Sequence, residues 1–283
     1  MQVSKYLKKW FPLFAMPAFL AFTLAFLVPF GLGLYLSFTR FRTVTNAHWV
    51  GFTNYINAFQ NNDFMNSLWF SVRFTVVSVV VVNIAAFALA LVLTKAIKGT
   101  NIFRAVFFLP NLIGGIVLGY IWQLMINGVL FATVQRDITY DSAYGFWGLV
   151  VLVNWQMIGY MMIIYIAGIQ NIPGEVIEAA DIDAAGPWAK LVNVTIPMVA
   201  SSITICVFLT VANCLKLFDQ NLALTAGAPQ RETEGLALNI FNTFYNSGTS
   251  QGVGQAKAVI FFVVVGLIAF IQLRATRSRE MDA

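Results

Sequence analysis

The sequence predicts an all-α integral membrane protein with six transmembrane helices. Of its 283 residues, 59% are hydrophobic and only 10% are charged, whereas soluble domains carry about 25% charged residues. The charges also fall in groups separated by long charge-free stretches. A spanning helix needs about 20 apolar residues, and a charge at the bilayer centre costs several kcal/mol. The mean hydropathy of +0.76 therefore indicates that lipid surrounds most of the chain.

The charge-free stretches place the helices. Between Arg73 and Lys95, for example, 21 consecutive residues are uncharged. The last stretch holds 16 residues, and Lys257 and Arg274 at its ends can extend their charged groups to water. The loops between stretches are too short to form a separate domain, so residues 1–283 are expected to form a single transmembrane domain. The expected helices cover residues 11–37, 68–94, 105–127, 145–169, 198–222 and 256–274.

Basic residues orient these helices. An even number of spans puts both termini on one side, where ten basic residues would lie against seven on the other. Lys and Arg favour the cytoplasmic side, so both termini are expected in the cytoplasm. Residues 95–104 and 170–197 would then be cytosolic. Residues 38–67, 128–144 and 223–255 would be short outer loops.

The composition disfavours several other classes of protein. The pI near 9.3 comes from scattered charges without a basic, aromatic-rich patch, so no nucleic-acid partner is expected. His48 is the only histidine, and Cys206 and Cys214 are the only cysteines, too few for a His/Cys metal site. The two cysteines lie about 12 Å apart along one expected helix, which is too far for a disulfide. The sequence has no phosphate-binding Gly-Lys-Ser/Thr loop, and no cofactor is expected.

Residues 170–197 form the longest expected cytosolic segment. Asn171 can cap a helix with Pro173 in its first turn, and Gly186-Pro187 breaks that helix before a second short one. The result is a helix–turn–helix knob in which Glu178 and the face of Ala179 and Ala180 are free.

The charge of this knob bears on its role. An amphipathic helix lying on the headgroups would be rich in Lys and Arg. This knob is acidic, so docking to another protein is favoured over the interfacial alternative. Its charged residues are Glu175, Glu178, Asp181, Asp183 and Lys190.

Polar residues within two expected helices are candidates for binding a solute. Thr210, Asn213 and Lys216 follow one another at intervals of three residues and would share one face of the fifth helix. Aromatic faces, amides and hydroxyls of this kind bind sugars, although hydrogen bonding between helices is the alternative for each residue. The fourth helix carries Asn154, Trp155, Gln156 and Tyr160.

Several other intramembrane features carry less specific interpretations. Asn83 and Gln123 are interpreted as packing groups, and Gly115-x-x-x-Gly119 as a site of close helix contact. Lys216 and Asp219 lie about one turn apart and form either a local ion pair or a pair that lines a gate.

Three motifs in order resemble the permease subunits of binding-protein-dependent ABC importers, in their maltose-type carbohydrate branch. Glu178-Ala179-Ala180 begins, and Val194-Thr195-Ile196-Pro197 ends, a segment similar to that family's EAA loop. Residues 168–173 (Gly-Ile-Gln-Asn-Ile-Pro) and 224–229 (Leu-Thr-Ala-Gly-Ala-Pro) also resemble the family. In one departure, Ala184 stands at the family's glycine position, which suggests a turn displaced toward Gly186.

The resemblance implies roles for single residues. Glu178 would pair with a basic residue of an ATPase, Ala179 and Ala180 would permit close approach, and Asp183 and Gly186 would shape the turn. Positions that line the substrate cavity in the maltose-type permeases correspond to Tyr160, Thr210, Asn213, Cys214 and Leu217, and Lys216 lies on the same expected stripe.

The resemblance also implies the function. The chain would be the transmembrane subunit of an ATP-driven importer that moves a carbohydrate across the cytoplasmic membrane of a prokaryote by alternating access. It would not itself be an enzyme. Its partners would be a second homologous permease subunit, two ATPase subunits or domains and an extracytoplasmic solute-binding protein. A secondary, ion-coupled transporter of a small polar solute is the alternative, but no midmembrane charge or inverted repeat supports it.

Overall fold

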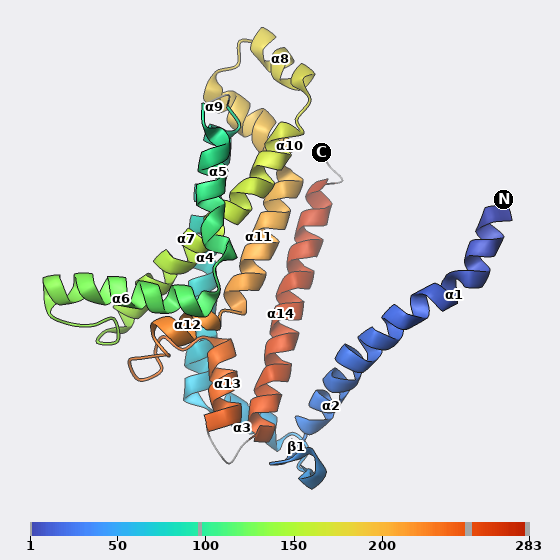
Figure 1. The fold of residues 1–283 in the computed structure, drawn as a ribbon, viewed down its shortest axis with the longest axis vertical. Helices are drawn as coiled ribbons and strands as arrows, with labels where there is room; N and C mark the ends of the chain where they lie inside the picture. The colour runs from blue at the N-terminus through green and yellow to red at the C-terminus, as the bar shows by residue number, and fades with distance from the viewer. Residues whose placement is uncertain (1, 96–97, 247–250, 281–283) are drawn as a thin grey trace. The chain divides into compact units, whose positions relative to one another are not determined.

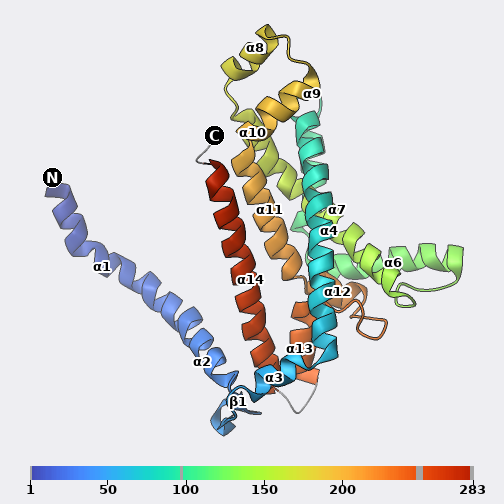
Figure 2. The ribbon, with the colours of Figure 1, turned by 180° about the vertical axis from the view of Figure 1, so that it is seen from behind.

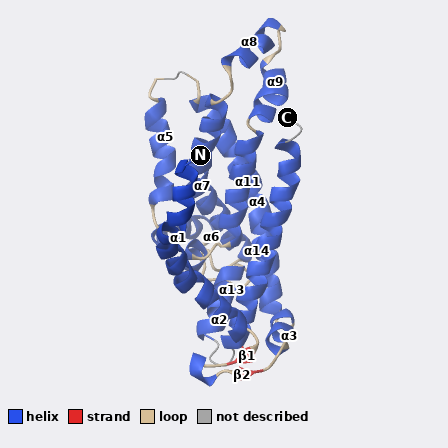
Figure 3. Ribbon diagram, turned by 90° about the vertical axis from the view of Figure 1, so that its right-hand side faces the viewer, coloured by secondary structure: helices blue, strands red, loops and turns tan. Residues whose placement is uncertain are grey.

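The computed structural model describes residues 2–95, 98–246 and 251–280, in which helices and one β-hairpin are joined by loops (Figures 1 and 3). The elements in chain order are α1 (Gln2–Phe22), the π-helix η1 (Thr23–Leu27), α2 (Val28–Leu36), β1 (Thr39–Arg40), the 3₁₀-helix η2 (Val44–Asn46), β2 (His48–Trp49), α3 (Thr53–Phe59), α4 (Asn62–Leu93), α5 (Thr100–Phe108), the 3₁₀-helix η3 (Leu109–Leu112), α6 (Gly115–Val134), α7 (Ser142–Gln170), α8 (Gly174–Ile182), α9 (Pro187–Lys190), the π-helix η4 (Leu191–Thr195), α10 (Ile196–Met198), α11 (Ala200–Leu215), α12 (Asp219–Leu224), α13 (Leu236–Asn246) and α14 (Gln251–Glu280).

Within the residues that the structure describes, five helical stretches are long and apolar enough to cross a membrane. A sixth arises if the bent pair Pro187–Met198 and Ala200–Leu215, whose directions differ by 70°, counts as one span. The chain is therefore a helical membrane protein with five to six candidate spans. The five are Leu13–Leu36, Asn62–Leu93, Gly115–Val134, Ser142–Gln170 and Gln251–Gln272.

The chain divides into two compact units, the first formed by residues 1–61 and 240–260. In this unit β1 and β2 pair antiparallel, with Thr39 opposite Trp49. The buried Asn54 side chain donates to the carbonyl oxygens of Ser37 (2.9 Å) and Thr39 (2.8 Å), which ties α3 to the end of α2 and to the hairpin. The expected outer loop 38–67 therefore contains a hairpin and a helix.

The last helix begins earlier than expected, and Lys257 is buried within it. The sequence suggested that Lys257 ends a span and reaches water, but α14 begins at Gln251 and Lys257 is only 1% exposed. Its Nζ donates to Thr243 Oγ1 (2.9 Å) and Asn61 Oδ1 (3.4 Å). Counting charge-free residues placed the helix start wrongly because polar partners inside the fold satisfy this ammonium.

The second unit comprises residues 62–239 and 261–283. Helices α4, α7 and α11 lie side by side in it (Figures 1 and 2). Small buried residues of α4, such as Ser78, Ala86 and Ala90, allow the neighbouring backbones to approach. Phe74 and Tyr165 fill the core between them. The expected helices 68–94 and 145–169 are present as α4 (Asn62–Leu93) and α7 (Ser142–Gln170), and both start earlier than expected.

The expected helix 105–127 is wrong as a single helix. After α5, Pro110 lies in the short η3, Ile113 is extended and Gly114 is the N-cap of α6, which runs in a different direction from α5 (Figure 1). α6 packs on α12 at the glycine motif, where a Cβ on Gly119 would lie 2.5 Å from that of Ala223. The close contact expected for this motif is therefore confirmed.

The expected helix 198–222 is also wrong at its end. α11 stops at Leu215, the backbone of Lys216 and Phe218 leaves helical geometry, and α12 restarts at Asp219. An acidic residue in the first turn favours a helix start because it lies near the positive end of the helix dipole. The following outer segment is not merely a loop, since it contains α13.

Candidate functional site

The segment 170–197 lies at the end of α7 away from α12 (Figures 1 and 2). In it, α8 is joined by a turn to a second helical stretch that runs from α9 through η4 into α10. Lys190 in the second helix forms an ion pair with Asp181 in the first, which ties the two together. The expected cap is wrong: Asn171 ends α7, and Pro173 occupies the N-cap position of α8 without a capping side chain.

The turn of this segment lies at Ala184, not at Gly186. Ala184 has a left-handed φ of 52°, and Asp183 is the C-cap of α8. The amide of Ala185 donates to the carbonyl of Ala180, and that of Ala184 to Asp181, both at 3.0 Å. These two bonds make a Schellman cap, whose left-handed position favours glycine. Gly186 has φ −66° and ψ 164°, a conformation that any residue can adopt, so the suggested displacement of the turn is wrong.

The surface of the segment differs partly from the expectation. Glu178, Ala179 and Asp183 are exposed, but Ala180 is only 9% exposed and is therefore unavailable to a partner in this state. Two apolar side chains that the sequence analysis did not single out are strongly exposed, Ile182 by 86% and Trp188 by 76%. The sequence could have indicated both residues, because large apolar side chains are unusual in an acidic, Ala-rich segment.

The conformation of the turn predicts different responses to substitution at two positions. Ala184→Gly is expected to stabilise the cap by about 1 kcal/mol, because glycine avoids the steric cost of left-handed backbone. Hydrogen exchange of the Ala185 amide should then slow by roughly fivefold. Gly186→Ala serves as the control and should leave that exchange rate unchanged. Faster exchange in Ala184→Gly would contradict the assignment.

A cavity of about 610 Å³ lies where α7, α11, α12 and η3 meet. It sits at the break between α11 and α12, so the end of one helix and the start of the next both face it. Its lining includes four of the six residues named as candidates for substrate contact: Tyr160, Asn213, Lys216 and Leu217.

Thr210 does not line this cavity. It is 0% exposed, and its Oγ1 donates to the carbonyl of Cys206 at 2.7 Å. Asn83 donates to the same Oγ1 at 3.4 Å and accepts a bond of 2.7 Å from the Tyr165 hydroxyl. Thr210 and Asn83 thus join α4, α7 and α11, and the expectation that Thr210 lines the cavity together with Asn213 is wrong.

Gln123, the other expected packing group, has the surroundings that the sequence indicated. Gln123 donates to the carbonyl of Leu224 at 2.8 Å, and this bond ties α6 to α12. Cys206 and Cys214 are both buried and free. Cys214 is therefore absent from the cavity lining, although the resemblance placed it there.

Amide groups complete the cavity lining. Gln220 Nε2 donates to Gln156 Oε1 at 2.7 Å, and Gln156 Nε2 donates to the carbonyl of Ile113 at 3.1 Å. Gln156 was noted in the sequence as a polar residue of the fourth helix. Gln220 and Asn111 were missed, because only the breaks after Leu215 and Phe108 bring them to the cavity.

Lys216 and Asp219 both line the cavity with charged groups. Ion pairs among the residues that the structure describes join Lys190 to Asp181 and Arg231 to Asp63. Lys216 and Asp219 are therefore not paired with each other here, so the reading as a local ion pair is not supported. A cavity with both charges, several amides and the Tyr160 ring can hold a polyhydroxylated solute by hydrogen bonds and ring contact.

A polar cavity at discontinuous helices of a membrane protein is typical of membrane transport proteins. Residues 98–279 match the family described as binding-protein-dependent transport system inner membrane component. The chain belongs to this family. It is thus a multi-pass inner membrane permease, and the ATPase of such a system is a separate component.

Individual relatives agree with this assignment. The chain is 41% identical to the probable starch degradation products transport system permease protein AmyD of Thermoanaerobacterium thermosulfurigenes, over 96% of both chains. It is 28% identical to the multiple sugar-binding transport system permease protein MsmF of Streptococcus mutans, over 90% of this chain and 91% of that protein. Its fold resembles a chain of a bacterial ABC transporter involved in the import of the acidic polysaccharide alginate, with a TM-score of 0.82, 18% identity and coverage of 98% and 99%.

Proposed function

We propose that this permease carries a sugar or oligosaccharide into the cell by alternating access, driven by ATP hydrolysis in partner subunits. The observation that carries the proposal is the cavity in which Tyr160 and Asn213 lie beside the bonded pair Gln156 and Gln220. Amides and an aromatic ring suit the hydroxyls and the apolar faces of a sugar. The names of relatives support the same class, since they include a trehalose/maltose permease and an arabinooligosaccharide permease.

The proposed topology has six spans with both termini in the cytoplasm. The bent pair of helices that begins at Pro187, within the knob, and ends at Leu215 supports a sixth span, and the excess of basic residues near both termini supports the orientation. Residues 1–283 then form a single permease domain with the knob 170–197 in the cytosol. A fusion reporter placed after Gly186 tests the side of the knob.

The proposed assembly contains a second, homologous permease subunit, two ATPase subunits or domains and an extracytoplasmic solute-binding protein. One of the solved structures that the fold resembles is an alginate ABC transporter in complex with an alginate pentasaccharide-bound periplasmic protein. We assign ATPase docking to Glu178, Ala179 and Asp183, all exposed, and add the exposed Ile182 and Trp188. Ala180 and Gly186 are not assigned to docking. The carbonyl of Ala180 accepts a hydrogen bond of the Schellman cap and so helps to hold the fold of the knob.

The proposed substrate contacts are Tyr160, Asn213, Lys216 and Leu217. Asn213 donates to the carbonyl of Leu209 at 2.8 Å, which leaves its Oδ1 as an acceptor for a sugar hydroxyl. Thr210, buried between helices, is assigned a packing role instead.

Asn213→Leu should lower sugar uptake by about three- to tenfold, because this change corresponds to the free energy of one or two lost hydrogen bonds to the sugar. Uptake of labelled maltotriose, trehalose and arabinotriose by cells that hold the complete transporter measures the effect. Thr210→Val is the matched control: it should lower thermal stability but leave the KM for transport unchanged. Unchanged uptake in Asn213→Leu would contradict this contact and would favour the alternative, a hydrogen bond within the helix packing.

A further inference from the structure

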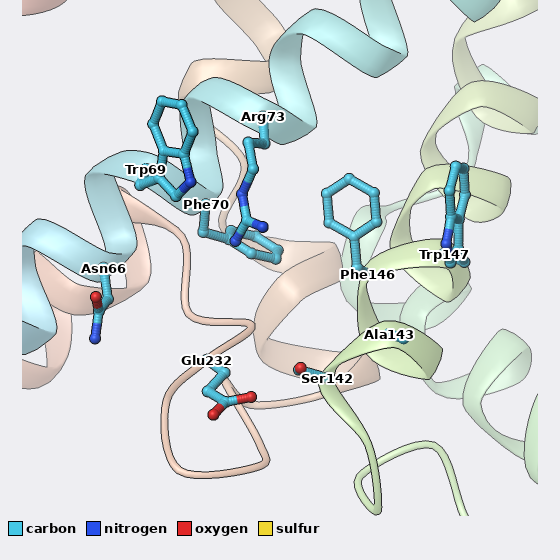
Figure 4. A pocket seen from close by; sticks show the side chains of 9 residues that line it. All are labelled: Asn66, Trp69, Phe70, Arg73, Ser142, Ala143, Phe146, Trp147 and Glu232. Atoms are coloured by element: carbon cyan, nitrogen blue, oxygen red, sulfur yellow. The ribbon is translucent and has the colours of Figure 1, made fainter.

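A second cavity, of about 420 Å³, lies apart from the substrate cavity, between the first turns of α7, the first part of α4 and the segment after α12 (Figure 4). Phe70 and Phe146, whose ring centroids lie 5.9 Å apart, are among its lining residues. Trp69 and Trp147 also line it and are exposed. It shares no lining residue with the substrate cavity, so its role requires a separate explanation.

This cavity carries one charge of each sign. Arg73 enters from α4 and Glu232 from the segment after α12, on opposite sides of the space in Figure 4. Within the described part of the chain, neither takes part in one of the ion pairs. The Arg73 guanidinium lies 5.9 Å from the centre of the Trp69 ring. Both charges are exposed and available to a ligand with complementary charges.

The position of Arg73 in α4 places the cavity at the membrane boundary. The 21 uncharged residues between Arg73 and Lys95 are about 31 Å long as a helix, close to the roughly 30 Å of the hydrocarbon core. Arg73 therefore lies at one edge of that core. Trp is enriched at this level of a bilayer, as Trp69 and Trp147 are here.

Apolar stripes lead from the cavity along both helices into the region of the hydrocarbon. On α4 the exposed residues Val76, Val80 and Ile84 follow Trp69 at helical spacing, and on α7 Val151 follows Trp147. A ligand with a polar head and apolar chains would contact the cavity and these stripes together.

We propose that this cavity binds the headgroup of a zwitterionic phospholipid of the phosphatidylethanolamine type. The phosphate contacts the Arg73 guanidinium, which matches phosphate geometry. The ammonium contacts the Glu232 carboxylate and the face of a flanking Trp ring. The acyl chains follow the stripes below. The proposed topology places this lipid in the outer leaflet of the membrane. Only this choice of leaflet rests on the proposed function.

Lipid retention tests this proposal without a transport assay. The complete transporter, purified from a mixture of phosphatidylethanolamine and phosphatidylglycerol, is delipidated in detergent, and its bound lipids are counted by native mass spectrometry. Arg73→Gln should lower the retained phosphatidylethanolamine by roughly tenfold, because a charge-assisted contact is lost. Arg136→Gln is the matched control, since Arg136 stacks on Tyr140 with its guanidinium 4.3 Å from the ring centre and lies outside this cavity.

Glu232→Gln distinguishes the two ends of the headgroup. It should remove the preference for phosphatidylethanolamine over phosphatidylglycerol, which has no ammonium, and keep the phosphate contact. Soluble glycerophosphoethanolamine should not displace the lipid, because it lacks the acyl chains. Equal retention in Arg73→Gln and wild type, a preference that survives in Glu232→Gln, or displacement by the soluble headgroup would each overturn the proposal. Retention is measured apart from sugar uptake, so failure of the sugar assignment would leave this result intact.

Discussion

Glu178→Lys is expected to lower sugar uptake by at least about tenfold while the permease remains in the membrane. Glu178 is exposed on α8, and the proposed docking pairs its carboxylate with a basic residue of the ATPase. Reversing one charge of an interfacial pair costs about 2–5 kcal/mol or more. Proteoliposomes that contain the complete transporter measure uptake and ATP hydrolysis together, and hydrolysis should no longer respond to the substrate-loaded binding protein.

Glu175→Lys is the matched control for this charge reversal. Glu175 is also exposed and lies in the first turn of the same helix. Reversal there should cost only about 0.3–1 kcal/mol through the helix dipole, so uptake should stay near the wild-type rate. Normal uptake in Glu178→Lys, or equal loss in both variants, would contradict the assigned contact.

Gly159→Ala is expected to disrupt the fold around the substrate cavity. The backbone of Phe107 and Phe108 lies directly against Gly159, and an added Cβ would overlap the Phe107 carbonyl. The end of α5 and η3 would have to move away from α7, and this movement would displace Asn111 from the cavity. Overpacking of this kind costs about 1–3 kcal/mol or more, so both the Tm of the purified complex and sugar uptake should fall.

Gly128→Ala in α6 controls for the extra methyl group. No atom outside its own helix lies within 4 Å of the position of a Cβ at residue 128, so Tm and uptake should stay unchanged. If Gly159→Ala also behaved as wild type, the close approach of α5 to α7 would be wrong.

The long spans could be predicted from the sequence because the length of an uncharged stretch is a simple indicator of a membrane-spanning helix. Charge-free length sets a span, and α4 and α7 follow that rule closely. The rule failed where the backbone breaks inside an uncharged stretch, as at Pro110 to Gly114 and after Leu215. It also failed at Lys257, because the hydrogen bonds that stabilise a buried ammonium come from residues distant in sequence.

The two parts of the candidate site were predictable to different degrees. The knob was located by its acidic residues and helix breakers, which act over short distances. Its turn was misplaced because Gly186 suggested a turn that the backbone makes at Ala184. The cavity lining depends on the two helix breaks. Asn213 and Lys216 were identified because they lie three residues apart in one expected helix, whereas Gln220 and Asn111, which only the breaks bring to the cavity, were not.

Crosslinking of the knob to the ATPase tests the central claim most directly. Ala179→Cys, in a chain with Cys206 and Cys214 replaced, is co-expressed with the partner ATPase and oxidised with and without ATP. Ala180→Cys is the control, since Ala180 is buried. We predict a specific crosslink from position 179 whose yield changes with ATP, and none from position 180. Absence of a crosslink from position 179, and from cysteines at positions 182 and 188, would contradict the knob as the coupling element.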